Sequence, residues 1–459
     1  MITDQLPRLA GAAGLLAGWL GLCLRARWLA RVADPAGSSS GSVAGAGAPV
    51  LIAFASQTGF AHELALDAAL ALRAGGVDCE VAALGEIDAA RLRRAGRALF
   101  IASTCREGDA PDNAVAFVER VMNTHPELHG LRHAVLALGD RHYPRFCGFG
   151  RELDAWLGDC GAEALFPRVE LDGADTAGLQ TWRHRLAEFA NAAEAVIEPP
   201  ENGWWRIRAR RHLNPGSAGA AAFHVELEAV SGPEADAGRL PLPEWEAGDL
   251  LQLLPPGGDQ RPRLYSVASL PTDGAVQLLV RAVSDAGGHP GLMSALLCGE
   301  APVGTTLRGR IRPHHNFRLG GNAARPLILI GSGTGLAGLL ALLRWRARQG
   351  NGCNWLIFGE RNAAHDNFHE SETDLLEQQR LLARCDRTYS RDAAREYVQH
   401  RLAHRAHTLR QWVRDGAAIY VCGNAVGMGP AVHDTLRTIL GDKTLAQLTR
   451  DGRYRRDLY

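Results

Sequence analysis

Three largely apolar segments, each running directly into a loop of small and polar residues, constrain the fold of this chain more than any other feature. The first is Val50–Ala55, which is apolar throughout, as expected of a strand buried on both faces of a sheet. Residues 98–102 and 133–138 are two more such segments, and each also leads into a polar loop. Loops that follow parallel strands converge at the crevice where the strand order of a doubly wound sheet reverses. The pattern therefore predicts an α/β domain with a ligand site at that crevice.

The first of these loops, Ser56-Gln57-Thr58-Gly59, is followed by a helical pattern over 61–73. A hydroxyl-rich turn at a helix N-terminus offers free N–H groups and the positive end of the helix dipole to an anion. Together the three loops resemble the FMN site of flavodoxin-type domains. The resemblance implies that residues 56–61 hold the phosphate, that 103–106 and 138–147 flank the isoalloxazine, and that Tyr143 stacks on the ring. The FMN-binding residues that it implies are Ser56, Gln57, Thr58, Gly59, Phe60, Ala61, Ser103, Thr104, Cys105, Arg106, Leu138, Gly139, Asp140, Tyr143, Phe146 and Cys147.

Arg106 departs from the flavodoxin pattern, which usually has Gly at this position. A positive charge beside the flavin favours its anionic reduced form, so our hypothesis is that Arg106 raises the FMN potential. A potentiometric titration of Arg106→Gly that shows no shift would contradict it.

The middle of the chain changes character after residues 198–203, whose Pro and Gly content predicts a linker. Short strand-like runs separated by Gly- and Pro-containing turns predict an antiparallel barrel. These runs cover 204–210, 222–230, 249–254, 263–269, 276–283 and 305–311.

Within this barrel the run Arg263-Leu-Tyr265-Ser266-Val-Ala-Ser269 offers a flat aromatic face, a guanidinium fork and two hydroxyls. An ordinary β-strand is the alternative interpretation. The run resembles the FAD signature of ferredoxin-reductase-like flavoproteins, and Gly291 opens a short helical run over 295–298 that offers backbone donors to a diphosphate. The FAD-binding residues that the resemblance implies are Arg263, Leu264, Tyr265, Ser266, Gly291, Leu292, Met293 and Ser294.

A third domain begins with an apolar strand over 326–330, followed by a Gly-rich turn and an apolar helix that extends to Arg348. No acidic residue stands about 20 positions further on to bind a ribose diol, which argues against a standard NAD site. Arginines near residue 390 suit the 2′-phosphate of NADP instead, although a solvated arginine surface is the alternative. The residues predicted to bind NADP are Gly333, Thr334, Gly335, Ser390, Arg391, Arg395, Tyr397 and Gln399.

The order of these motifs, together with the ending Arg453-Tyr-Arg-Arg-Asp457-Leu-Tyr459, resembles that of diflavin reductases, particularly sulfite reductase flavoproteins and NADPH–haemoprotein reductases. The resemblance implies that hydride passes from NADPH to FAD, and that single electrons pass to FMN and on to a protein acceptor. The sequence does not identify that acceptor; a haemoprotein and a membrane-bound oxidoreductase subunit are the two candidates. The same resemblance places Cys422 beside the nicotinamide, Ser266 near the flavin N5 and Asp457 in support of Cys422. Tyr459 is expected to stack on the FAD ring and to swing aside for the nicotinamide.

Simpler interpretations of these residues stay open, because Cys422 could be a small core residue and Tyr459 a frayed end. Gly338 replaces the usual Pro after the Gly-rich turn, and only residues 255–262 separate two strands between which relatives insert a helical connecting domain. Two other functions are therefore alternatives: an NADPH oxidoreductase that carries FAD alone, and a non-catalytic, membrane-tethered interaction module. The flavin content of the purified protein separates the three.

The N-terminus contains an uncharged run over 9–24, bounded by Arg8 and Arg25. Its 16 residues fall short of the roughly 20 that span a bilayer comfortably. The run is therefore either a membrane anchor or an amphipathic docking helix. Three arginines follow the run, which predicts a single-pass anchor in the inner membrane with the catalytic domains in the cytoplasm.

Composition adds few further constraints. The net charge of zero gives no nucleic-acid footprint, and nine Cys without a C-x-x-C pair argue against a zinc ribbon or a disulfide scaffold. Residues 104–175 carry 13 acidic residues against 7 Arg, which indicates either a solvated face or an acidic docking face. The predicted parts are a membrane-anchor helix (1–32), a linker (33–49), a flavodoxin-like domain (50–197), a linker (198–203), an FAD-binding barrel (204–324) and a ferredoxin-reductase-like α/β NADP domain (325–459).

Overall fold

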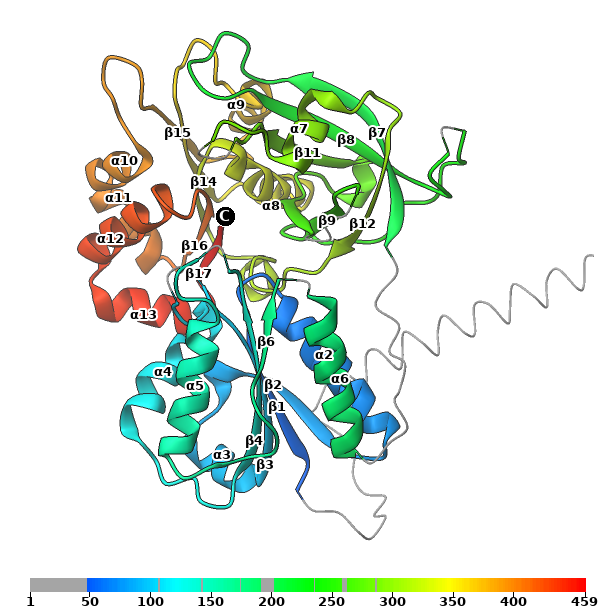
Figure 1. Cartoon of the computed structure of the whole chain (residues 1–459). Coiled ribbons are helices and arrows are strands. Elements are labelled where there is room, and N and C mark those ends of the chain that lie inside the picture. The colour runs from blue at the N-terminus through cyan, green and yellow to red at the C-terminus, as the bar shows by residue number, and fades with distance from the viewer. Residues whose placement is uncertain are drawn as a thin grey trace, which may run out of the picture. The chain divides into compact units, whose positions relative to one another are not determined.

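The computed structural model describes residues 48–105, 108–141, 143–173, 175–190, 202–234, 236–257, 262–284 and 287–459. The apolar run at 9–24, Arg106 and most of the linker at 198–203 lie outside these residues. Among the helices that the structure describes, none is both long enough and apolar enough to cross a membrane. Residues 48–459 belong to one compact unit, in which the described strands form three sheets (Figure 1).

The first sheet is parallel, with the strand order β2-β1-β3-β4-β5, and β6 pairs with the far end of β4. This is the doubly wound order of flavodoxin-like folds, as predicted. Its strands are β1 (Val50–Ala55), β2 (Cys79–Ala83), β3 (Arg97–Ser103), β4 (Arg132–Gly139), β5 (Glu163–Ala164) and β6 (Val169–Asp172). Its helices are α2 (Phe60–Ala74), α3 (Ala89–Ala95), α4 (Val115–Arg120), α5 (Gly148–Asp159) and α6 (Thr176–Ala190).

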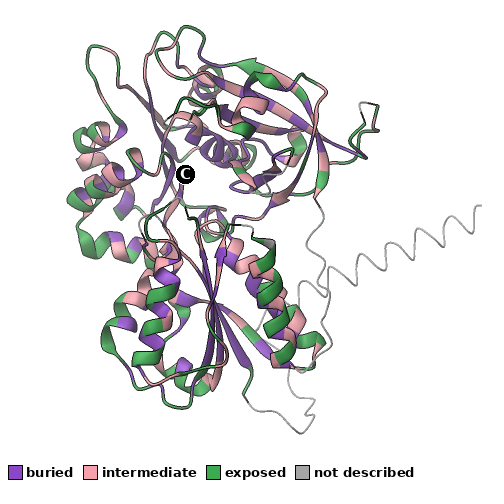
Figure 2. Ribbon diagram, in the orientation of Figure 1, coloured by how far each residue is buried: buried purple, intermediate pink, exposed green. Residues whose placement is uncertain are grey.

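The apolar runs of β1, β3 and β4 are buried because helices cover both faces of this sheet (Figure 2). Phe117 of α4 and Leu153 of α5 pack in one cluster, whereas Leu64 of α2 and Trp182 of α6 pack in another. Continuous apolar strands, rather than alternating ones, are what such double cover requires.

The second sheet is antiparallel, with the order β10-β9-β12-β7-β8-β11. A bridge between Val267 and Leu278 joins its two outer strands, so the sheet closes into the predicted barrel. β9 and β10 are direct antiparallel neighbours, at the point where relatives are expected to carry a helical insert. The strands are β7 (Gly203–His212), β8 (Ala222–Val230), β9 (Leu250–Leu254), β10 (Arg263–Ser266), β11 (Val276–Arg281) and β12 (Thr306–Arg312).

The short helix of the barrel differs from its prediction. The sequence favoured a helical run over 295–298, whereas the structure has α7 at Leu292–Ala295, followed by a π-helical turn over Leu296–Glu300. Gly299 leaves helical geometry inside that turn and so ends the helix.

The third sheet is parallel, with the order β15-β14-β13-β16-β17. Its strands are β13 (Leu327–Ser332), β14 (Asn354–Glu360), β15 (Arg384–Tyr389), β16 (Ala418–Gly423) and β17 (Tyr454–Leu458). Its helices are α8 (Leu336–Arg348), α9 (Glu370–Gln378), α10 (Val398–His404), α11 (Ala406–Arg414), α12 (Met428–Leu440) and α13 (Asp442–Arg450). The order is that of a doubly wound nucleotide-binding fold, whose ligands lie at the carboxyl ends of the strands.

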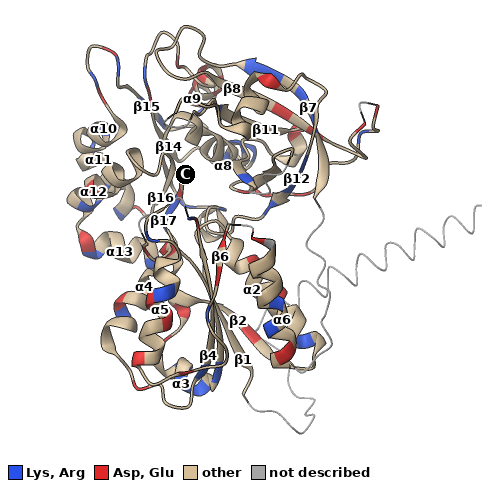
Figure 3. Cartoon of the chain, viewed as in Figure 1, with Lys and Arg blue, Asp and Glu red and all other residues tan. Residues whose placement is uncertain are grey.

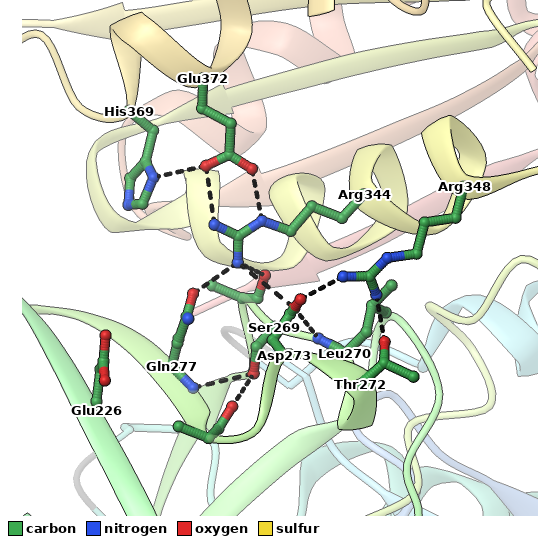
Figure 4. A network of polar contacts seen from close by, with 12 residues as sticks. Glu226, Ser269, Leu270, Thr272, Asp273, Gln277, Arg344, Arg348, His369 and Glu372 are labelled. Carbon is green, nitrogen blue, oxygen red and sulfur yellow. Dashed lines mark hydrogen bonds and ion pairs between the residues drawn. The ribbon is translucent and has the colours of Figure 1, made fainter. Parts of the chain in front are cut away.

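Arg344 of α8 fixes the barrel against the third sheet (Figure 4). Its guanidinium binds both oxygens of Glu372, at 2.6 and 2.8 Å, and donates to Gln277 Oε1 at 2.6 Å. It also donates to the carbonyl of Ala268 at 2.9 Å, two residues after β10. Burial alone would raise the pKa of Glu372, but hydrogen bonds from Arg344 and His369 lower it to about 2. The carboxylate is therefore charged and firmly held at neutral pH.

Candidate functional site

Three polar side chains from three different strands meet in the interior between the barrel and the third sheet. Ser266 ends β10, Cys422 lies in β16 and Asp457 lies opposite it in the register of β17. Ser266 Oγ donates to Asp457 Oδ2 at 2.7 Å, and Cys422 Sγ lies 3.6 Å from the same oxygen. All three are buried, which raises the pKa of the Cys422 thiol well above its usual range, and the Asp457 charge adds to this effect. The thiol is therefore protonated at neutral pH.

Gly338 in α8 faces this cluster directly. A Cβ atom there would lie 3.4 Å from Cys422 Sγ, 3.6 Å from Ser266 Cβ and 3.1 Å from the Phe317 ring. The position at which relatives are expected to have Pro therefore lies against the two residues expected to serve hydride transfer, where Gly avoids a tight contact.

Tyr459 continues the pairing of β17 with β16. Its N–H donates to the carbonyl of Gly423 at 3.1 Å, and its own carbonyl accepts from Ala425 N at 3.0 Å. Its side chain is half-exposed, and the hydroxyl lies 3.3 Å from Thr334 Oγ1 in the Gly-rich turn. The backbone is thus held in place, while the ring stays accessible beside that turn.

The Gly-rich turn follows β13 at the carboxyl edge of the third sheet, immediately before α8. Gly333 has a φ of +59°, and a Cβ atom at Gly335 would lie 2.2 Å from the carbonyl oxygen of Cys422. These two positions require Gly for different reasons: the first for its backbone angle and the second for a close approach to β16. In nucleotide-binding folds a turn at this place presents the first N–H groups of the following helix to an anion.

The predicted 2′-phosphate residues lie on and just beyond the loop that follows β15. Arg391 and Arg395 are exposed, and neither forms an ion pair with a described residue. Asp392 shapes the loop by accepting from Asn362 Nδ2 at 3.2 Å and Ala363 N at 3.1 Å. Ser390 is partly buried, Tyr397 is exposed, and Gln399 lies in the first turn of α10. Their common loop brings these residues to the same edge of the sheet as the Gly-rich turn.

In the barrel, the FAD motif occupies β10, with Arg263 paired to Leu253 and Tyr265 to Leu251 of β9. Burial raises the pKa of Tyr265. Ser269, whose hydroxyl the sequence offered to a ligand, instead donates to the carbonyl of Ala275 at 2.8 Å and accepts from Gln277 N at 3.0 Å. It serves the turn that follows the motif.

The second FAD segment, 291–294, is also ordered by its own contacts. Ser294 Oγ donates to the carbonyl of Gly291 at 2.9 Å and accepts from Val283 N at 3.3 Å. Met293 is buried in the barrel core, whereas Leu292 is exposed.

The FMN-type loops contain two buried hydroxyls that fit an absent phosphate. Ser56 Oγ and Thr104 Oγ1 are both shielded from solvent, and neither has a hydrogen-bond partner among the described residues. Buried polar atoms are nearly always paired, so two such donors in the loops after β1 and β3 fit the phosphate of an FMN bound at this edge of the sheet. Gly59, with a φ of +89°, turns the chain into α2 beside them.

Gln57 in the same loop is already engaged by protein groups. Its Oε1 accepts from Asp112 N at 3.1 Å, and its Nε2 donates to Asp112 Oδ2 at 3.2 Å and to the carbonyl of Arg456 at 3.1 Å. Cys105 Sγ lies 3.7 Å from Gln57 Oε1. The side chain therefore ties two loops of the first sheet to β17.

The residues of the third FMN-type loop differ in how far they are exposed to solvent. The Tyr143 side chain is 48 % exposed, as stacking on a ring at the surface requires. Cys147 is fully buried with its Sγ 3.4 Å from the carbonyl of Ala137, while Phe146 lies beneath the guanidinium of Arg141, 5.0 Å from the ring centroid. Leu138 is buried in β4, Gly139 ends that strand, and exposed Asp140 follows it.

Contacts between the first sheet and the rest of the unit were not expected from the sequence. Arg456 Nε donates to Asp112 Oδ2 at 2.9 Å, and one carboxylate, Glu63, accepts from Arg310 at 2.8 Å and Arg312 at 2.9 Å. His314 Nε2 lies 2.9 Å from the carbonyl of Gln57. No local pattern marks these residues, because each meets its partner only in the folded chain.

Several acidic side chains of the segment 104–175 form ion pairs with arginines, so fewer of them are available to a partner than the composition indicated. Asp112 is paired with Arg456, Asp154 with Arg168, Glu170 with Arg151 and Asp172 with Arg141. Figure 3 shows acidic and basic residues interspersed over the described helices.

Known proteins resemble this chain along most of its length. The flavodoxin family model matches residues 52–184, and the model for the oxidoreductase NAD-binding domain matches 329–434. The sulfite reductase [NADPH] flavoprotein alpha-component of Bacillus subtilis (strain 168) is 26 % identical over 538 aligned residues, covering 89 % of each chain. The protein of the same name from Sodalis glossinidius (strain morsitans) is 27 % identical over 591 residues, covering 99 % of this chain and 98 % of its own.

Over most of its length the chain therefore resembles the diflavin reductases. Both alignments are longer than the 459 residues of this chain, so the relatives contain segments without a counterpart here. In this chain β9 pairs directly with β10, at the point where relatives are expected to carry the helical insert. Its barrel therefore passes from one strand to the FAD motif without a connecting domain.

Proposed function

We propose that this protein is an NADPH-dependent diflavin reductase that passes electrons through FAD and FMN to a protein acceptor, a haemoprotein or a sulfite-reductase-like partner. The observation that carries the proposal is the buried cluster of Ser266, Cys422 and Asp457 beside the Gly-rich turn. A hydroxyl, a thiol and a carboxylate brought together from the FAD motif and the nucleotide sheet suit the transfer of hydride between a nicotinamide and a flavin.

Each residue of the cluster has a definite task in this function. Asp457 accepts a hydrogen bond from Ser266 and so holds this hydroxyl of the FAD motif in one orientation. Cys422 supplies a neutral thiol with little bulk, and Asp457 offers the negative charge that stabilises a developing nicotinamide cation. When bound, the flavins supply the step from paired to single electron transfer, and the protein sets their distance and environment.

The binding residues follow from the loops described above. We propose that Ser56, Thr58, Gly59 and Thr104 hold the FMN phosphate and that Tyr143 stacks on its ring. Arg263, Tyr265 and the segment 291–294 hold FAD, and Tyr459 covers its ring until the nicotinamide arrives. Gly333–Gly335 and the group Ser390, Arg391, Arg395, Tyr397 and Gln399 hold NADPH. The corresponding lobes are 50–197, 204–324 and 325–459.

Flavin analysis of the purified protein tests this function directly. We expect FMN and FAD in a ratio near one and bleaching of both by NADPH. FAD alone would indicate a single-flavin oxidoreductase, and a colourless protein that stays colourless on reconstitution would contradict any redox role.

Removal of Tyr459 should relax the preference for NADPH over NADH, because the nicotinamide then no longer has to displace the ring.

We also propose that residues 9–24 attach the protein to the cytoplasmic side of the inner membrane. The support is the uncharged run between Arg8 and Arg25 and the arginines that follow it. Membrane fractionation of the full chain and of a chain starting at residue 48 tests this. Equal partitioning of the two into the membrane-free fraction would exclude it.

A further inference from the structure

Arg281 and Glu360 form a mostly buried ion pair that is separate from the cluster of Ser266, Cys422 and Asp457. Arg281 ends β11 of the barrel, and Glu360 ends β14 of the third sheet. Arg281 Nη2 donates to Glu360 Oε1, and its Nη1 donates to the carbonyl of Ala220 at 2.9 Å. The side chains are 20 % and 3 % exposed, respectively. The pair thus joins the two sheets with one cation and one carboxylate.

This pair faces the backbone of the Gly-rich turn. A Cβ atom at Gly333 would lie 3.4 Å from Glu360 Oε1 and 3.7 Å from Arg281 Nη2. In dinucleotide-binding folds this turn receives the diphosphate, against the N–H groups that open the next helix. A diphosphate on the turn would therefore meet both the guanidinium, which attracts it, and the carboxylate, which repels it.

We propose that Arg281 binds the diphosphate of the nicotinamide dinucleotide and that Glu360 takes up a proton when it does so. The inference rests on the proposed use of NADPH. Arg281 retains guanidinium donors beyond the two engaged with Glu360 and Ala220, and guanidinium forks suit phosphate oxygens. When the phosphates bind Arg281, its positive charge is shared between them and Glu360. The Glu360 carboxylate is then less well neutralised and also lies near the two negative charges of the diphosphate. A buried carboxylate in that position is unfavourable unless it is protonated.

The groups around Glu360 make this proton uptake feasible near neutral pH. Arg281 faces it from β11, Arg361 follows it and donates its N–H to Oε2 at 3.1 Å, and Tyr389 stands opposite in β15. Asp366 also acts on Glu360: it is a buried carboxylate that accepts from Ser217 Oγ at 2.9 Å and from backbone and amide donors. Burial raises the pKa of Glu360 to about 7, with Asp366 adding to the effect and the two arginines opposing it.

Calorimetric titration with NADP⁺ measures the proton directly. The flavin-loaded full chain is titrated at pH 7.5 in two buffers of different ionisation enthalpy, which gives the number of protons taken up. We expect roughly half a proton or more from Glu360, because a group with a pKa near 7 passes from mostly ionised to mostly protonated. Glu360→Gln is the matched control: it retains the size and a hydrogen bond to Arg281 but cannot titrate. Any proton exchange that remains in this variant comes from groups other than Glu360, including the 2′-phosphate, whose binding by arginines favours proton release.

The affinities give a second, independent readout. We expect Arg281→Ala to weaken NADP⁺ binding about ten- to hundredfold, the range for a lost charge-assisted hydrogen bond. The same variant should bind 2′-AMP as tightly as the parent, since that ligand lacks the diphosphate, and this binding also reports a folded nucleotide lobe. Arg391→Ala should weaken both ligands.

Two results would overturn the inference. One is equal proton uptake by the parent and Glu360→Gln, and the other is unchanged NADP⁺ affinity in Arg281→Ala. Both leave the proposed function intact. A parent chain that binds neither NADP⁺ nor 2′-AMP would instead refute the proposed function itself, and this inference with it.

Discussion

Glu372→Gln should destabilise the junction between the barrel and the third sheet, and its effect should depend on pH in a defined way. The substitution keeps the size of the side chain but removes the charge that Arg344 and His369 bind at 2.6–3.0 Å (Figure 4). The pKa of Glu372 is about 2, against an ordinary value of 4.5. Each pKa unit corresponds to about 1.4 kcal/mol, so the charged form contributes at most about 3 kcal/mol at pH 7.

The sign of the pH dependence follows from the lowered pKa. The contribution is complete above about pH 4.5, where the unfolded carboxyl is ionised, and it is lost as pH falls towards 2. With these two pKa values, the gap between parent and variant should shrink from about 3 kcal/mol at pH 7 to about 2 kcal/mol at pH 3.5.

Urea unfolding at both pH values measures the gap, with hydrogen exchange of peptides from α8 and α9 as the readout. A local readout is needed because a chain of several lobes need not unfold in two states. Asp374→Asn is the control on the same helix: Asp374 pairs with Arg387 at 2.8 Å but its side chain is 44 % exposed, so its loss should change stability by at most about 1 kcal/mol. A gap that does not change with pH, or an equal effect of Asp374→Asn, would refute the reasoning.

Further predictions concern the flavin loops, the buried cluster and the lobe contact. Ser56→Ala with Thr104→Ala should lower the FMN content and leave FAD unchanged, as chromatography of released flavins will show; equal loss of both flavins would contradict the phosphate assignment. Asp457→Asn should slow flavin reduction by NADPH about ten- to hundredfold in stopped flow at normal FAD content, because it removes a charge that assists the transition state; an unchanged rate argues against that role. Asp112→Asn leaves Arg456 without its carboxylate and should loosen the first lobe, which small-angle scattering will register as a larger radius of gyration. An identical scattering profile would mean that the other contacts suffice.

The sequence predicted those parts of the fold that local patterns determine. The apolar run of β1 with its polar loop indicated a doubly wound sheet, and short strands between Gly and Pro turns indicated the barrel. Ser266, Cys422 and Asp457 were assigned separately by resemblance, and the structure brings them within hydrogen-bonding range.

Contacts between distant segments could not be predicted in this way. Gln57 and Arg456 meet across 399 positions of sequence, and neither lies in a pattern that announces a partner. The pair Arg281–Glu360 is also a contact between distant segments. Each residue ends an ordinary strand, and the two meet only because the barrel packs against the third sheet. Ser269 shows the converse: a hydroxyl of the right type, in the right motif, is used by a turn.

The alternation of β17 has a consequence for how this terminus tolerates change. Neighbouring residues of a strand point in opposite directions, so Arg456 reaches Asp112 while Asp457 reaches Ser266. Inserting one residue just upstream would place Arg456 where Asp457 now meets Ser266, whereas deleting one would place Asp457 opposite Asp112 and Leu458 beside Ser266. Single-residue indels here should therefore be far more harmful than substitutions, since each removes the carboxylate from Ser266 and also changes the residue that faces Asp112.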